Sequence, residues 1–181
     1  CKTWGTPNTI SYSAAITACE KGGQQHLALS LLQAMSAEKI WPNTTSYSAA
    51  ISACAQGKFW ERALELLEDC NTWKMPDTIS YSAAITACEK GGQQHCALSL
   101  LQAMSAEKIW PNTTSYSAAI SACAQGKCWE RALELLEDCK TWGMPGTISY
   151  SAAISACAQG IKALRLKGSR SRNLRQKQII S

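Results

Sequence analysis

The chain has 181 residues, of which 46% are hydrophobic and 17% charged, with a formal net charge of +5. This composition is normal for a folded protein, and no apolar run reaches the roughly 18 residues of a membrane-spanning helix. The charge is divided unevenly: residues 1–138 hold ten Lys or Arg against thirteen Asp or Glu, and residues 139–181 hold eight against none. A mildly acidic body has no overall attraction for nucleic acid, so a polyanion would have to bind to local groups or to the basic tail.

Prolines recur along the chain at intervals of 35, 34, 35 and 34 residues, and no proline falls outside this series. A fixed period of this size indicates an array of small repeated units rather than one globular domain. Any functional surface is then built by stacking, with each unit contributing equivalent positions. The prolines are Pro7, Pro42, Pro76, Pro111 and Pro145.

Each unit is predicted to contain two helices. In the first, Tyr12, Ala15, Ile16 and Cys19 stand at i, i+3, i+4 and i+7, which is one apolar stripe of about three turns. The preceding Pro-Asn-Thr is a helix-start signal, and a glycine turn ends the helix. A second apolar stripe follows and runs to the next proline; it consists of Ala28, Leu31, Leu32 and Met35 in odd units and Trp60, Ala63, Leu64, Leu67 and Cys70 in even units. Helical hairpins joined in this way predict an all-α right-handed solenoid.

Residues 7–75 and 76–144 are near-identical copies that differ at five positions. Residues 1–6 match the end of a unit, so the chain opens with the end of a preceding repeat. Four complete repeats and a partial fifth then occupy residues 7–160. From Ile161 onward the second helix of the fifth unit is lost, and residues 161–181 are expected to be a disordered basic tail. An RNA-contacting arm, a chance helix, and a non-homologous end left by recombination or a shifted reading frame are the alternatives for this tail.

Ten cysteines raise the possibility of metal or disulfide chemistry, but their spacing argues against both. Cys19, Cys54, Cys88, Cys123 and Cys157 repeat with the period of the prolines, and the sequence contains no CxxC pair. We therefore predict no metal site, and free thiols that serve as small apolar residues. The sequence also holds no catalytic constellation or phosphate loop, so we expect neither an enzyme nor a cofactor.

The unit resembles the pentatricopeptide repeat family. The resemblance rests on the Ser11-Tyr12-Ser13 opening, on Ile16 and Cys19, on the Ala63–Leu67 segment of the second helix, and on the closing Pro-Asn or Pro-Asp. It covers about residues 7–160. The resemblance implies binding of single-stranded RNA, with about one base recognised per repeat by two or three side chains.

In this family the fifth residue of a unit and the last residue before the next unit face the base edge together. With units starting at Thr9, Thr44, Thr78 and Thr113, the resemblance implies the base-binding pairs Ser13 with Asn43, Ser48 with Asp77, Ser82 with Asn112, and Ser117 with Gly146. Ser151 begins a fifth pair that has no partner. Ser/Asn favours adenine and Ser/Asp favours guanine in the family, which predicts 5′-A-G-A-3′ for the first three units. Gly146 has no side chain, so the fourth base is read weakly or not at all.

The second residue of each unit sandwiches bases in the family, and here it is Ile10, Thr45, Ile79, Thr114 and Ile148. The serines also fit a simpler role as small polar residues near a helix start, and Asn43 and Asp77 fit one as helix caps. The capping role is compatible with base contact. The tryptophans all recur with the repeat, so we expect them to pack between units rather than to stack on bases.

The predicted function is sequence-selective single-stranded RNA binding in organellar RNA processing or stability. The resemblance implies a chloroplast or mitochondrial location, and the sequence shows no targeting peptide. A fragment with so few repeats is expected to bind RNA weakly. The alternatives are a protein-binding scaffold, which the acidic body and identical serines favour, and a recently duplicated fragment without a selected function.

Overall fold

The computed structural model describes residues 7–73, 76–143 and 146–162. These residues form helices joined by short turns, and no strand occurs among them. The helices are α1 (Thr9–Lys21), α2 (Gln25–Ala37), α3 (Thr44–Gly57), α4 (Trp60–Thr72), α5 (Thr78–Lys90), α6 (Gln94–Ala106), α7 (Thr113–Gln125) and α8 (Trp129–Thr141). Residues 147–162 are helical as well, and we call them the final helix.

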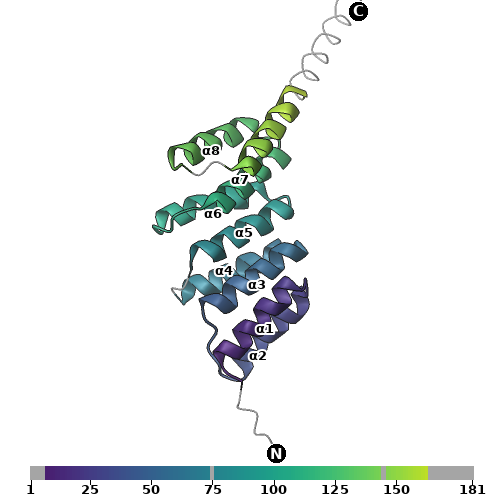
Figure 1. Ribbon diagram of the computed structural model, residues 1–181, viewed down its shortest axis with the longest axis vertical. Helices are drawn as coiled ribbons and strands as arrows, with labels where there is room; N and C mark the ends of the chain where they lie inside the picture. Colours follow the sequence, from purple (N-terminus) through teal and green to yellow (C-terminus); the bar gives the residue numbers. More distant parts are fainter. Residues whose placement is uncertain (1–6, 74–75, 144–145, 163–181) are drawn as a thin grey trace, which may run out of the picture.

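The helices stack in pairs along one axis, with the two ends of the chain at opposite ends of the stack (Figure 1). The first helices of successive units, α1, α3, α5 and α7, pack against one another in order. Each second helix packs against the first helix of its own unit, and α2, α4 and α6 also pack against the first helix of the next unit. This arrangement confirms the predicted all-α solenoid.

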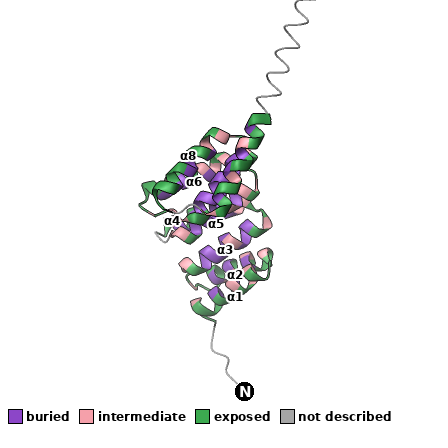
Figure 2. Cartoon of the chain, turned by 45° about the horizontal axis from the view of Figure 1, so that its top comes forward, coloured by how far each residue is buried: buried purple, intermediate pink, exposed green. Residues whose placement is uncertain are grey.

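The core is a continuous apolar seam between the two layers of helices (Figure 2). Its centre is the isoleucine of the first-helix stripe, which is completely buried in four units, at Ile16, Ile51, Ile85 and Ile120. Alanines of the second helices lie opposite and are equally buried, because a small side chain lets the helices approach closely. The four acidic side chains of α4, those of Glu61, Glu65, Glu68 and Asp69, are all exposed.

The first helices are capped by the residue that follows each repeated proline. Asn8, Asn43, Asp77 and Asn112 have extended backbones, and each side chain accepts a hydrogen bond from the backbone N–H three residues later. Such a cap satisfies one of the free N–H groups of the first turn. The final helix begins after Gly146, which has no side chain to do this.

The final helix continues through Ile161 and Lys162, the first two residues of the segment predicted to be a basic tail. Residues 163–181 lie outside the described residues, as do residues 1–6. None of the described helices combines the length and the apolar character needed to cross a membrane.

Candidate functional site

The polar residues singled out by the repeat pattern meet where the first helix of one unit packs on the first helix of the next. At the α1–α3 junction, Ser13 Oγ lies 2.7 Å from Thr9 O, 3.1 Å from Asn43 Oδ1 and 2.8 Å from Ser46 Oγ. Asn43 Oδ1 also accepts hydrogen bonds from the backbone N–H and the hydroxyl of Ser46, both at 2.9 Å. The predicted pair Ser13 and Asn43 is therefore in direct contact.

The α5–α7 junction repeats this network. Ser82 Oγ lies 3.1 Å from Asn112 Oδ1 and 2.8 Å from Ser115 Oγ, and Asn112 Oδ1 caps α7 through the Ser115 N–H at 2.9 Å. Identical networks at two sites follow from the near-identity of the two halves of the chain. The second predicted pair of Ser and Asn is brought together as well.

The other two junctions differ. Ser48 Oγ donates to Thr45 O at 3.2 Å, while Asp77 Oδ1 accepts from the backbone and hydroxyl of Ser80. No hydrogen bond joins Ser48 to Asp77 among the described residues. At the last junction Ser117 Oγ lies 2.9 Å from Ser149 Oγ. Gly146 offers no side chain there.

Two hollows open beside the Ser–Asn networks. The first hollow has a volume of about 580 Å³ and is lined by Ile10, Ser13, Ala14, Thr17, Ala18, Lys21, Asn43 and Thr45. It unites the predicted pair with the two predicted sandwiching residues, one from each unit. Ile10 and Thr45 are both exposed at its sides.

The second hollow, of about 380 Å³, lies at the equivalent junction two units later. Its lining includes Ile79, Ser82, Lys90, Asn112 and Thr114, the equivalents of five residues of the first hollow. It is also lined by Glu20, Ser52, Ala55, Gln56, Ala83 and Thr86. Each hollow thus combines an apolar side, an amide and a lysine.

Four of the five predicted base-binding serines are buried. Ser13, Ser48, Ser82 and Ser117 keep only 5–8% of their surface exposed, because each is covered by the next first helix. Ser151 is exposed, and its hydroxyl donates to Ile148 O at 2.9 Å. At two junctions the buried serine also donates a hydrogen bond to the asparagine of its predicted pair.

The amide orientation follows from the network. A backbone N–H can only donate, so the Asn43 atom that it meets must be the oxygen. That oxygen already lies within 3.1 Å of three groups that can donate, whereas no described residue accepts a hydrogen bond from Asn43 Nδ2. Asn43 and Asn112 are both half-buried, and Asn112 makes the same network of hydrogen bonds. Each hollow is therefore lined by an amide whose unused group is a donor.

The sequence interpretation missed two groups at these junctions. Ser46 and Ser115, the third residues of their units, are fully buried and complete the networks. Lys21 and Lys90 line the hollows at the ends of α1 and α5. The signal was present, since this serine recurs in every unit and the lysine in both odd units, but a pattern does not show which face a residue takes.

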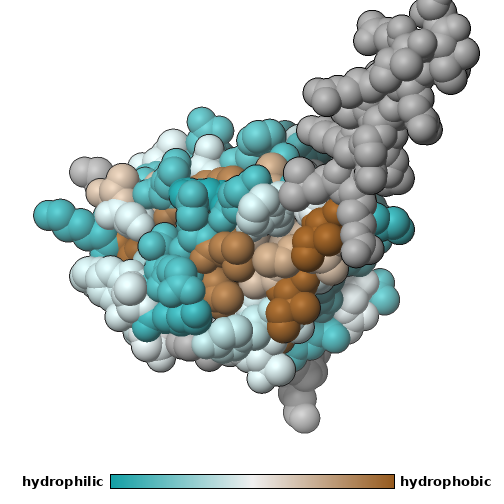
Figure 3. Space-filling model, turned by 90° about the horizontal axis from the view of Figure 1, so that it is seen from above, coloured by the Kyte–Doolittle hydropathy of each residue, from teal (hydrophilic) through white to brown (hydrophobic). Residues whose placement is uncertain are grey.

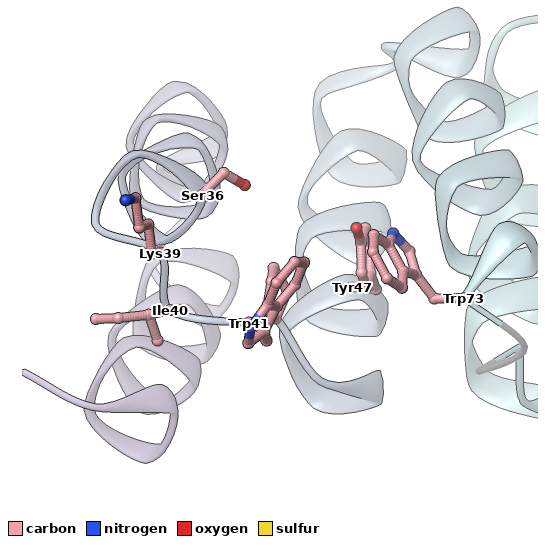
Figure 4. Close-up of a pocket in the computed structure, with 7 residues that line it drawn as sticks. Ser36, Lys39, Ile40, Trp41, Tyr47 and Trp73 are labelled. Carbon is pink, nitrogen blue, oxygen red and sulfur yellow. The ribbon is translucent and has the colours of Figure 1, made fainter.

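The expected packing of the tryptophans holds for only part of the set. Trp60 and Trp129 pack against the core. Trp41 and Trp73 contact each other across a unit boundary with ring centroids 5.2 Å apart, yet 69% and 51% of their surfaces are exposed. Together with Tyr47 and Lys39 they line an apolar slot of about 740 Å³ (Figure 4). Trp110 and Trp142 form an equivalent pair.

The described cysteines are all free thiols, as expected, and five of the nine are buried. Burial raises the pKa of the Cys54 and Cys123 thiols to about 11 and that of Cys88 to about 12. A thiol with so high a pKa is a poor nucleophile and metal ligand. Within the described ranges, no group of three or more His, Cys, Asp or Glu side chains is placed to hold a metal ion.

Comparison with known proteins gives a consistent result. The family model of the pentatricopeptide repeat domain matches residues 6–57 and 65–126, and the PPR repeat model matches residues 45–71 and 114–144. No curated protein sequence matches the chain.

Several solved structures share the fold. The pentatricopeptide repeat protein PPR10 from maize, in complex with an 18-nt psaJ RNA element, has a TM-score of 0.74 and 20% identity over 91% of this chain and 24% of that chain. The PPR domain of Arabidopsis thaliana protein-only RNase P 1, in complex with tRNA, has a TM-score of 0.71 and 15% identity over 88% and 85%. The A. thaliana nuclear proteinaceous RNase P 2 has a TM-score of 0.71 and 15% identity over 85% and 35%. This chain therefore spans about a quarter of PPR10 and about a third of RNase P 2.

Proposed function

The chain belongs to the pentatricopeptide repeat family, and on that premise we propose that it binds single-stranded RNA with about one base per repeat. The proposed base-binding residues are Ser13, Asn43, Ser48, Asp77, Ser82, Asn112, Ser117 and Ser151; Ser13 with Asn43 and Ser82 with Asn112 are in direct contact. The shared fold with PPR10, a protein solved in complex with an RNA element, supports this proposal. Binding rather than catalysis is the proposed activity.

The hydrogen-bonding capacity of the two hollows is the observation that carries the proposal. Asn43 Nδ2 is a donor without a partner among the described residues, and Ser13 Oγ has one proton but three oxygen neighbours within 3.1 Å. Ser13 can therefore act toward a base as an acceptor only. A donor beside an acceptor complements the N1 and N6–H₂ groups of adenine. Ser82 and Asn112 offer the same donor and acceptor, so we propose that they bind a second adenine.

The intermediate junction offers a different pattern. Asp77 Oδ1 is occupied by Ser80, which leaves the second carboxylate oxygen as an acceptor. Guanine presents two donors, N1–H and N2–H₂, on its pairing edge, and an acceptor favours it over adenine. With one base per unit, the proposed target is 5′-A-G-A-3′, with an unselective fourth position at Gly146.

The rest of each hollow suits a nucleotide. Ile10 with Thr45, and Ile79 with Thr114, stand on either side of the proposed base and offer it apolar surface; Ile148 is the equivalent residue of the last junction. Lys21 and Lys90 provide local positive charge for phosphate on a body that is acidic overall. The proposed setting is processing or stability of organellar transcripts, in a chloroplast or mitochondrion, and its support is family membership alone.

The test is a titration of the full chain with a labelled single-stranded RNA octamer containing AGA. Replacing either adenine with uracil should weaken binding about tenfold, because a well-paired base edge contributes about 1–3 kcal/mol of discrimination. Asn43→Ala should cost a similar factor for the AGA octamer. Asn43→Asp should shift the preference at that base from adenine toward guanine.

Asn8→Ala is the matched control. Asn8 caps α1 as Asn43 caps α3, so both variants lose one cap, but Asn8 lines neither hollow. Asn8→Ala should leave RNA affinity unchanged. Equal affinity for the AGA octamer and a scrambled octamer would contradict base recognition. If that unselective affinity also falls steeply with salt concentration, the binding comes from phosphate contacts.

A protein-binding scaffold is the second candidate, and the exposed tryptophan pairs favour it. The slot of Trp41 and Trp73 is apolar and lies apart from both hollows. Aromatic residues of this kind are enriched at protein interfaces. A helical spectrum without detectable RNA binding would favour this candidate.

A further inference from the structure

The final helix exposes a tyrosine and an isoleucine whose equivalents every earlier first helix buries. Ile154 is 68% exposed, whereas the equivalent isoleucine of each preceding unit has no exposed surface. Tyr150 is 41% exposed, against 1–9% for its four equivalents. Tyr150, Ile154, Cys157 and Ile161 stand at i, i+4, i+7 and i+11, so they form one continuous line, which we call the open stripe.

No described helix follows the final helix in the place of a second helix, and the position at the end of the stack does not explain the exposure. At the opposite end, α1 has no further described unit beside it either, yet Tyr12 and Ile16 are buried where α1 packs against α2 and α3. Apolar side chains gather on the C-terminal end of the molecule (Figure 3). The four complete units thus show how the equivalents of Tyr150 and Ile154 are buried.

The residues after the final helix do not repeat the covering pattern. In the complete units the buried alanine of the second helix lies 16 residues after the tyrosine, as in Ala28 after Tyr12. In the same register from Tyr150, the positions of Ala28, Leu31, Leu32 and Met35 are taken by Leu166, Ser169, Arg170 and Asn173. Three of the four are polar, so the chain's own sequence is a poor cover.

We propose that the open stripe is a docking site for an acidic amphipathic helix of a partner protein. The template is α4, which packs against α3 and buries Ala63, Leu66, Leu67 and Cys70, while α3 buries Tyr47, Ile51 and Cys54. A partner helix with apolar residues at i, i+3, i+4 and i+7 would cover the open stripe in the same manner.

Charge selects the acidic type of helix. The final helix carries Lys162 and no acid, and residues 163–181 add six Lys or Arg and no acid. The helix α4 exposes Glu61, Glu65, Glu68 and Asp69 on the face opposite its apolar stripe. Such a helix brings negative charge to the only strongly basic part of the chain, whereas α2 carries neither Asp nor Glu nor Lys nor Arg.

The experiment measures binding of a fluorescent peptide with the sequence of residues 58–73 to the full chain by anisotropy in reducing buffer. We expect saturable binding that weakens at least tenfold in the Ile154→Asp chain or with a Leu66→Asp peptide. A peptide of residues 23–37, which has the apolar stripe but no net charge, should bind several-fold more weakly. That difference should shrink in about 1 M salt, where the Debye length is about 3 Å.

Ile148→Asp is the matched control, because Ile148 is an equally exposed isoleucine on the same helix but off the open stripe. It should leave peptide affinity unchanged. Peptide binding that Ile154→Asp does not weaken would overturn the proposal, as would equal or tighter binding of the neutral peptide. A lower melting temperature of the Ile154→Asp chain would indicate that residues of the same chain cover the open stripe. A dimer that Ile154→Asp dissolves would assign it to a second copy. Either result would also overturn the proposal.

Discussion

At the scale of single residues, four lysines occupy the left-handed backbone region that normally favours glycine. Lys39, Lys58, Lys108 and Lys127 have φ between 58° and 63°, each just after a helix ends. Gly23 and Gly92 take this conformation at the turns equivalent to those of Lys58 and Lys127. A side chain there is strained because its Cβ approaches the following carbonyl oxygen.

Replacing Lys58 with glycine should therefore stabilise the chain. Relief of the left-handed strain exceeds the entropy that glycine adds to the unfolded state, for a net gain of about 0.5–1 kcal/mol. Urea denaturation followed by circular dichroism measures this change. Lys21→Gly is the control, because Lys21 is helical and the same substitution there should cost about 1 kcal/mol. A loss of stability at both positions would contradict the strain argument.

Glu89 predicts a pH dependence. Burial raises the pKa of its carboxyl, and Lys90 and the hydrogen bond from Gln125, at 3.1 Å, offset this only in part. The folded chain then binds the proton more readily than the unfolded chain, so this contribution to stability is present at low pH and lost as pH rises through the folded pKa. Glu89→Gln should raise the melting temperature at pH 7 but not below about pH 4, where the wild-type carboxyl is protonated. An equal effect at both pH values would contradict this assignment.

At the scale of helices, Asn43 and Asn112 each cap a helix and line a hollow from one position. Asn43 caps α3 through Oδ1, and the same bonds leave Nδ2 as a donor at the first hollow. The cap is therefore what fixes the hydrogen-bonding character of the hollow. The last junction lacks both functions, because Gly146 neither caps the final helix nor contributes a polar group.

Gly146→Asn should restore both. As a cap it should add a few tenths of a kcal/mol to about 1 kcal/mol to stability, measured by thermal unfolding. A Cβ at this position would lie 3.2 Å from Thr113 Cγ2, so the threonine must shift by a few tenths of an ångström. The variant should also gain adenine preference at the fourth base of an RNA. Gly146→Ala is the control, since it meets the same threonine without capping. An equal effect of both substitutions would contradict the capping role.

At the scale of the whole molecule, stability is the sum of similar units and of the contacts between neighbours. The described residues have no single hydrophobic centre; the seam of isoleucines, tyrosines and alanines runs through the stack. The last described unit has a first helix with neighbours on one side only.

Equivalent isoleucines should consequently differ in their importance. Ile85→Ala removes a fully buried side chain and should cost about 2–5 kcal/mol, because it leaves a cavity in the seam. Ile154→Ala, at the same place in an almost identical helix, should change stability by no more than about 0.5 kcal/mol. Chemical denaturation of both variants measures the difference. A similar loss in both would show that Ile154 is covered in solution.

The sequence by itself determined the local structure of this protein. The proline period, the apolar stripes, and the Asn and Asp caps predicted every described helix, because these depend on residues close in the chain. The tertiary structure alone decided exposure. The segment TISYSAAI begins α1, α5 and the final helix, yet its last residue is fully buried at Ile16 and Ile85 and mostly exposed at Ile154. Ser13 likewise lies hidden under the next helix while Ser151 is open. Burial depends on what packs over a side chain, and here that partner comes from another part of the fold.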